Sequence, residues 1–129
     1  MTDWPSYQNF TSGEFACRCG CGQSPMDDGF MSWLQAIRTV WGRPMTITSG
    51  YRCPKHPVEA KKARPGAHAS GKAVDIAVAN GQEAHALVKL AMAMDVLGLA
   101  IKLSDGQRFI HLDMMDSRAE APRPACWEY

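Results

Sequence analysis

Two histidines and one aspartate in this chain are spaced so that together they could hold a metal ion. His68 and Asp75 lie in the stretch HASGKAVD, and His111 lies in the later segment FIHLD. Two neutral imidazoles and one carboxylate form a ligand set that leaves the fourth position of a tetrahedral zinc open for water. Hydrolysis requires such an open position, so these residues indicate a hydrolytic metal site.

Two predicted β-strands and one loop must position these residues. Apolar residues alternate around Asp75, which predicts a strand with Asp75 on the face opposite the core. The same period of two places His111 and Asp113 on one side of a second strand. His68 comes from a stretch rich in Gly and Ala, whose backbone can turn sharply. A loop can therefore carry His68 back over the polar face of the first strand.

These segments resemble a known family, the zinc D-alanyl-D-alanine carboxypeptidases and L-alanyl-D-glutamate endopeptidases. The matching motifs are SGYR at 49–52, HASGKAVD at 68–75 and HLD at 111–113. This family includes many bacteriophage endolysins and shares its fold with the Hedgehog signalling domain. The resemblance begins at the segment FACRCGC at 15–21 and covers most of the chain.

The resemblance implies a substrate and a set of roles. The substrate would be the stem peptide of peptidoglycan, and Arg52 would stabilise the transition state. Ser49 and Tyr51 belong to the same SGYR motif and are further site candidates. Arg52 could instead pair with a structural carboxylate. One catalytic zinc would bind to His68, Asp75 and His111.

The general base is not at the position where several branches of the family carry it. That position, three residues before His111, is Arg108, which does not release a proton at any relevant pH. Asp113 is the first candidate because it shares a strand face with His111, although it could instead hold a ligand in place. Asp105, in a predicted hairpin turn, is the second candidate. Glu59 or a substrate carboxylate would follow.

Five cysteines need a separate explanation. Three lie in the Cys-rich segment at 15–22, Cys53 directly follows Arg52, and Cys126 is near the carboxy terminus. One or two disulfides would suit an enzyme that acts outside the cytoplasm, with Cys53 joined to the amino-terminal segment as the preferred pair. A second, structural zinc is the alternative, although the pattern CxCxC lacks the wider spacing usual in zinc knuckles.

Length and patterning predict one α+β domain over residues 1–129, with a small antiparallel sheet and flanking helices. The resemblance implies that it is a zinc peptidase domain with the fold of the Hedgehog domain and the D-Ala-D-Ala peptidases. With 46% hydrophobic residues, the chain can bury one core. Helical spacing after Asp27 runs to Gly42, and a second helix follows Asn80 and ends at Gly98. Strands are expected at 45–49, 73–78, 99–103 and 109–114, the last two joined as a hairpin.

The net charge and the amino-terminal sequence indicate which partners and which cellular location to expect. The net charge is +1 with scattered basic residues, so we expect no nucleic acid and no anionic membrane as a partner, and we expect a monomer. The amino terminus lacks the pattern of a secretory signal. We therefore expect synthesis in the cytoplasm and action on the cell wall after release, or as part of a virion.

The ligand residues indicate metal-dependent hydrolysis, and the resemblance implies that the bonds cut are amide bonds of the peptidoglycan stem peptide. It would be of the D,D-carboxypeptidase or the L-Ala-D-Glu endopeptidase type, in a phage or prophage lysin. The alternatives are a catalytically weak, zinc-containing module that binds the cell wall, and a structural protein of a virion. The choice of bond depends on the shape of the pocket, which the metal motif does not set.

Overall fold

Five strands form one sheet in the computed structural model, which describes residues 1–129. Their order across the sheet is β1-β2-β4-β3-β5, and all neighbours are antiparallel except β3 and β5, which are parallel. This is the expected α+β class with a small, mostly antiparallel sheet. The parallel edge strand β5 was not predicted. The strands are β1 (Ile47–Ser49), β2 (Ala73–Ala77), β3 (Gly98–Lys102), β4 (Phe109–Asp113) and β5 (Ala125–Glu128).

Two helices of three or more turns, α2 (Asp28–Trp41) and α3 (Gly81–Ala93), begin at the predicted caps. The Asp27 carboxylate accepts a hydrogen bond from the amide of Phe30, and the Asn80 side chain does the same for Glu83. Gly42 ends α2 in the left-handed conformation, with φ of 73°. No helix has the length and apolar character needed to cross a bilayer. Shorter helical segments are Trp4–Ser6, α1 (Ser12–Phe15) and Glu59–Lys61.

One boundary of the predicted helices is wrong, and the last turn of α2 is less buried than the rest of the helix. Helix α3 ends at Ala93 and not at Gly98, because Asp95 takes a left-handed φ of 63° and Gly98 already begins β3. Val40, which has the spacing of the buried stripe of α2, is 65% exposed in its last turn. The fully buried part of its apolar stripe ends at Ile37, and Trp41 packs partly buried against the core.

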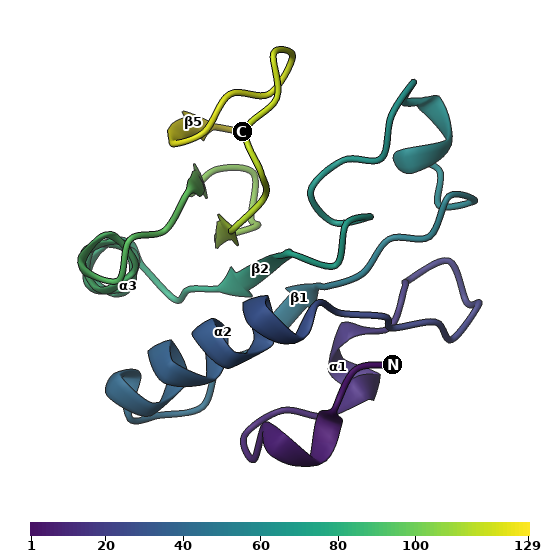
Figure 1. The fold of residues 1–129 in the computed structure, drawn as a ribbon. Helices are drawn as coiled ribbons and strands as arrows, with labels where there is room; N and C mark the ends of the chain where they lie inside the picture. Colours follow the sequence, from purple (N-terminus) through teal and green to yellow (C-terminus); the bar gives the residue numbers. More distant parts are fainter.

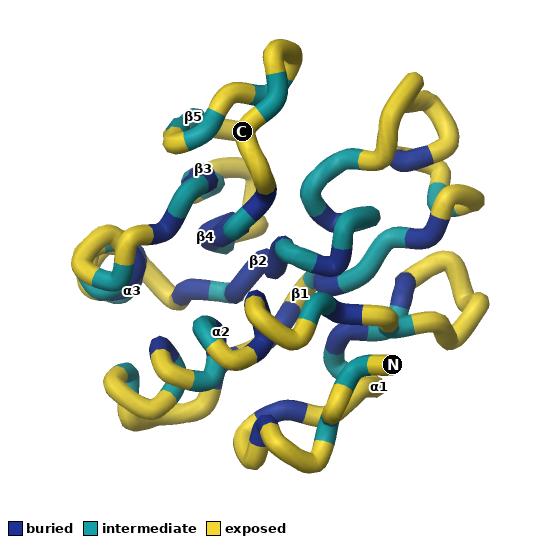
Figure 2. Tube along the Cα trace, viewed as in Figure 1, coloured by how far each residue is buried: buried dark blue, intermediate teal, exposed yellow.

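The sheet separates an apolar core from a polar site. Side chains from α2 and α3 pack with those of one sheet face to form the core, which includes Val74, Ile76, Ile110 and Leu112. In Figure 1, the teal loop between β1 and β2 and the yellow carboxy-terminal segment lie on the other side of the sheet from α2. Figure 2 shows that β2 and β4, in the middle of the sheet, are mostly buried. Polar residues on the second face are therefore shielded by strands and by irregular segments.

The register between β2 and β4 determines which polar residues face each other. Asp75 lies opposite His111, and Ala73 lies opposite Asp113. The predicted hairpin joins β3 to β4 through a turn in which Asp105 and Gly106 have φ of 60° and 75°. Because side chains alternate across a sheet, this register brings Asp75, His111 and Asp113 to one face.

A close backbone contact places the chain that follows β1. The amide of Tyr51 donates a hydrogen bond to the carbonyl of Phe15 at 2.9 Å. A Cβ atom built on Gly50 would lie 2.7 Å from the Cα of Phe15, which is closer than real Cβ contacts allow. Gly50 is therefore needed for the approach of these two segments.

We expect Gly50→Ala to destabilise the protein by about 1–3 kcal/mol, because the methyl group overlaps backbone atoms that cannot rotate away. Gly81→Ala is the matched control, since a Cβ there meets nothing within 4 Å. Urea unfolding of both variants measures the difference. Equal stability of the two variants would contradict the close packing at Gly50.

Candidate metal centre

The three predicted ligand residues lie together on the polar face of the sheet. His111 Nδ1 is 3.0 Å from Asp75 Oδ1, and His68 Nε2 is 3.3 Å from the same oxygen. Ligands at two corners of a tetrahedral zinc, each bonded at about 2.0–2.1 Å, are about 3.3 Å apart. All three residues are buried. The arrangement therefore fits a zinc ion with three protein ligands and one open position.

His68 has the orientation that a zinc ligand needs. Its Nδ1 donates to the carbonyl of Gly50 at 2.7 Å, so the lone pair belongs to Nε2. That Nε2 atom is buried, faces Asp75 and makes no hydrogen bond. An unpartnered nitrogen in the interior is costly unless something binds it, and a metal ion supplies that partner.

His111 is held from both sides of its ring. Its Nε2 donates to Asp113 Oδ2 at 2.7 Å, while its Nδ1 faces Asp75. The Asp113 carboxylate also accepts two hydrogen bonds from the guanidinium of Arg123, at 2.9 and 2.8 Å, and one from the amide of Met115. A Cβ on Gly98 would overlap that carboxylate, so glycine leaves the room for it.

The buried charges shift the pKa values of these groups. Burial alone would raise the pKa of Asp75, but its contacts with His111 and His68 outweigh burial and lower it. In the same way, contacts with His111 and Arg123 overcome burial and lower the pKa of Asp113 to about 2. Burial opposes protonation of His111, yet Asp113 and Asp75 raise its pKa above 6.5. Without a cation in the site, His111 therefore tends to hold a second proton.

Asp113 does not have the geometry of the general base that we expected first. It contacts Nε2 of His111, on the opposite side of the ring from Nδ1 and the other ligand atoms. It is fully buried, and four donors already occupy its oxygens. The geometry favours the alternative that we left open, in which Asp113 holds His111 in place.

The other candidate bases are also outside the site. The side chain of Asp105 is 86% exposed in the β3–β4 turn, where it lies 3.7 Å from Lys102 Nζ. Glu59 is buried and accepts hydrogen bonds from Lys62 Nζ and the amide of Gly66. Neither residue lines the cavity that contains His68 and His111.

The residues of the SGYR motif differ in how close they lie to the predicted metal ligands. Arg52 Nη2 is 3.8 Å from Asp75 Oδ2, and the amide of Arg52 donates to the carbonyl of His68. Ser49 pairs with Asp75 at the edge of the sheet. Tyr51 packs partly buried against the core, and burial raises its pKa. Only Arg52 has a charged group beside a metal ligand.

The carboxy-terminal segment supplies residues that sequence reasoning missed. Together with the ligand histidines it lines a cavity of about 480 Å³, within the usual range for ligand sites. The ring of Trp127, on β5, lies 5.3 Å from that of His111, and Arg123 lies over Trp127. The segment has no apolar alternation that would have predicted a strand. The arginines and aromatic residues between 118 and 129 were the sequence feature that could have indicated a contribution to the site.

The Cys-rich segment meets Cys53, as expected, but no disulfide forms. All five cysteines are free thiols. The sulfur atoms of Cys19 and Cys53 are 3.3 Å apart, a contact distance and not a covalent bond. The preferred disulfide is therefore wrong for this structure, although the predicted proximity is correct.

A family model of known proteins matches most of the chain. Residues 8–113 match the family model described as Peptidase M15. No curated protein matches the chain. The matched residues include both ligand histidines, Asp75, Arg52 and Asp113.

We expect His68→Ala to lower the zinc content of dialysed protein by one equivalent per chain, because the site loses a nitrogen ligand. Elemental analysis measures the content. His85→Ala, at an exposed position of α3, is the control and should retain all zinc. Full retention by the His68 variant would contradict this ligand set.

The same site should bind zinc more weakly at low pH. Zinc must displace the second proton of His111, so its affinity falls as pH decreases through the raised pKa of that residue and levels off above it. Since that pKa lies above 6.5, the weakening should begin above pH 6.5.

We expect Asp113→Asn to weaken zinc binding by about 10–100-fold, because the amide cannot replace the charged partner of His111 and Arg123. Competition with a chelator gives the affinity. If the variant binds zinc normally but loses about two to four decades in rate, Asp113 is the general base after all.

Proposed function

This chain belongs to the peptidase M15 family and is a zinc metallopeptidase, and we propose that it hydrolyses amide bonds in the stem peptides of peptidoglycan. The match over residues 8–113 confirms the family, the hydrolase class and the zinc cofactor that the sequence motifs indicated. The family implies a substrate of the peptidoglycan type. The bond that is cut and the biological setting are our proposals.

The opening of the ligand set onto a cavity is the observation that carries this proposal. His68 and His111 both line the cavity, so a substrate bound there reaches the metal ligands directly. The aromatic rings of Trp127 and Tyr129 form part of the wall beside His111. A buried ligand set that faces a cavity suits a reacting centre, whereas a metal that only clamps the fold is closed by protein ligands.

The charges of the cavity support a substrate with carboxylates, as stem peptides have. Only one lining residue, Glu120, is anionic. Five are cationic: Arg52, Lys62, Arg64, Arg118 and Arg123. Several of these cations already have carboxylate partners. Arg118 has none, since its guanidinium donates only to the carbonyl of Pro65. We propose that Arg118 binds a carboxylate of the peptide.

Protein groups around the ligands would then act on the bound peptide. Zinc at this site supplies Lewis-acid polarisation of the scissile carbonyl and a lower pKa for the attacking water. Arg52, with its guanidinium beside Asp75, donates hydrogen bonds to the carbonyl oxygen as negative charge develops there. Glu120, the only carboxylate lining the cavity, accepts the proton of the attacking water. Its carboxylate accepts a hydrogen bond from Arg64 Nη1 at 2.7 Å.

We propose that the protein serves as a phage or prophage lysin that reaches the cell wall after release. A catalytically weak module that binds the cell wall is the second candidate. Two observations favour it: Arg108 stands at the position where the resemblance leads us to expect an acid, and Asp113 is fully engaged with its neighbours.

Digestion of purified muropeptides by the zinc-loaded protein tests the function. Mass spectrometry of the products shows whether the D-Ala–D-Ala or the L-Ala–D-Glu bond is cut. Binding of muropeptides without any cleavage would favour the second candidate. If the protein neither cleaves nor binds them, the substrate proposal is wrong.

In the same assay we expect Arg52→Lys to lower the turnover number by about two to three decades, because lysine lacks the planar fork of donors. Glu120→Gln should lower it by about two to four decades. Both variants should keep their zinc. Arg43→Lys, which changes an exposed arginine paired with Glu83, is the control. A normal rate in either site variant would remove the role assigned to that residue.

A further inference from the structure

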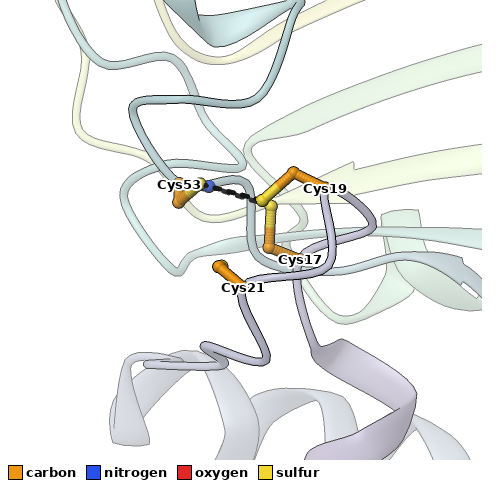
Figure 3. Close-up of side chains that lie close together, drawn as sticks. All are labelled: Cys17, Cys19, Cys21 and Cys53. Carbon is orange, nitrogen blue, oxygen red and sulfur yellow. Dashed lines mark hydrogen bonds between the residues drawn. The ribbon is translucent and has the colours of Figure 1, made fainter.

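Four sulfur atoms from two distant segments converge beside the sheet. Three lie on the loop that follows α1, and the fourth lies directly after Arg52 (Figure 3). Their Sγ atoms are all within 4.8 Å of one another: those of Cys17, Cys19, Cys21 and Cys53. Cys17 and Cys53 are buried, whereas Cys19 and Cys21 are exposed. The cluster therefore has an interior side and a side open to solvent.

The loop at 17–23 is bent so that alternate residues face one point. Gly20 and Gly22 have φ of 95° and 74°, a conformation that other residues rarely adopt. A Cβ on either glycine would meet nothing within 4 Å, so backbone conformation and not space explains the two glycines. The amide of Cys17 donates to the carbonyl of Gln23 at 2.8 Å, which closes the loop. Because the loop is bent, the three closely spaced cysteines of CxCxC can face one metal ion, although the motif lacks the wider spacing usual in zinc knuckles.

The separation of the sulfur atoms fits a tetrahedral metal. Zinc bonded to four thiolates at about 2.3 Å holds them about 3.8 Å apart. Here the sulfur atoms of Cys19 and Cys53 are 3.3 Å apart, and all four lie within 4.8 Å of one another. The amide of Cys53 donates a hydrogen bond to Cys17 Sγ at 3.3 Å, which joins the two buried cysteines of the cluster. One disulfide would use only two of the four sulfur atoms. It would not explain why the other two sulfur atoms also lie in the cluster.

We propose that these four cysteines bind a second zinc ion, separate from the ion held by His68, Asp75 and His111. Each thiol releases its proton to solvent as its sulfur bonds to the metal. The ion is closed by four protein ligands, so its role is structural. The inference stands on the cysteine geometry alone and does not depend on which peptide bond the enzyme cuts.

The second zinc would fix the segment that carries Arg52. Residues 50–53 are tied to the amino-terminal segment by two hydrogen bonds, from Tyr51 to Phe15 and from Cys53 to Cys17. Gly50 in this segment accepts the hydrogen bond that orients His68. A metal bound to Cys53 therefore restrains a stretch of chain that contacts both the oriented ligand and the cavity.

Zinc content of the reduced protein tests the proposal. We expect two zinc ions per chain in the wild type, and one in Cys19→Ser and in Cys21→Ser, both at exposed positions. Cys126→Ser is the matched control, because this exposed cysteine lies on β5 and outside the cluster, and it should retain two. His68→Ala should lose only the other ion. One zinc per chain in the wild type, unchanged in the cysteine variants, would overturn the proposal.

Measurements on the wild type keep the proposal falsifiable if the variants fold poorly. In the zinc-loaded protein only one of the five cysteines, Cys126, should react with a thiol reagent, and all five should react after chelation in denaturant. Cobalt(II) in place of zinc should give thiolate-to-cobalt charge-transfer absorption. A disulfide between Cys19 and Cys53 in protein purified without reductant, or iron in place of zinc, would contradict the assignment.

Discussion

The pairing of β2 with β4 is the constraint on which the metal centre depends. It sets Asp75 opposite His111 and leaves Asp113 on the same face, so one imidazole lies between two buried carboxylates. A shift of one residue in this register would move the ligands of one strand into the core and its apolar side chains into the site. The apolar core formed with α2 and α3 therefore also fixes the geometry of the ligands.

Two buried carboxylates require positive charge nearby, because an unpaired charge in the interior is strongly unfavourable. Arg123 supplies it to Asp113 through two hydrogen bonds, whereas Arg52 lies farther from Asp75, at 3.8 Å. Asp75 and the unpartnered Nε2 of His68 thus remain for the metal ion. The two carboxylates therefore have different roles: Asp75 binds zinc, and Asp113 orients the ligand His111.

Much of this arrangement could be predicted from local sequence. Alternation placed Asp75, His111 and Asp113 on polar strand faces, and the caps at Asp27 and Asn80 located the starts of both main helices. Contacts made by residues from distant segments could not be predicted from local sequence patterns. Arg123 reaches Asp113 from an irregular segment with no periodic pattern, so the sequence left two roles open for this carboxylate, general base or support of His111, and the contacts favour the second.

Anomalous diffraction at the zinc absorption edge, from crystals of the zinc-loaded protein, tests the central claim most directly. The account predicts a peak about 2.0–2.2 Å from His68 Nε2, His111 Nδ1 and one oxygen of Asp75, with Asp113 still bonded to His111 Nε2. A peak on the Nε2 side of His111 with Asp113 as a ligand, or no peak between these residues, would contradict it.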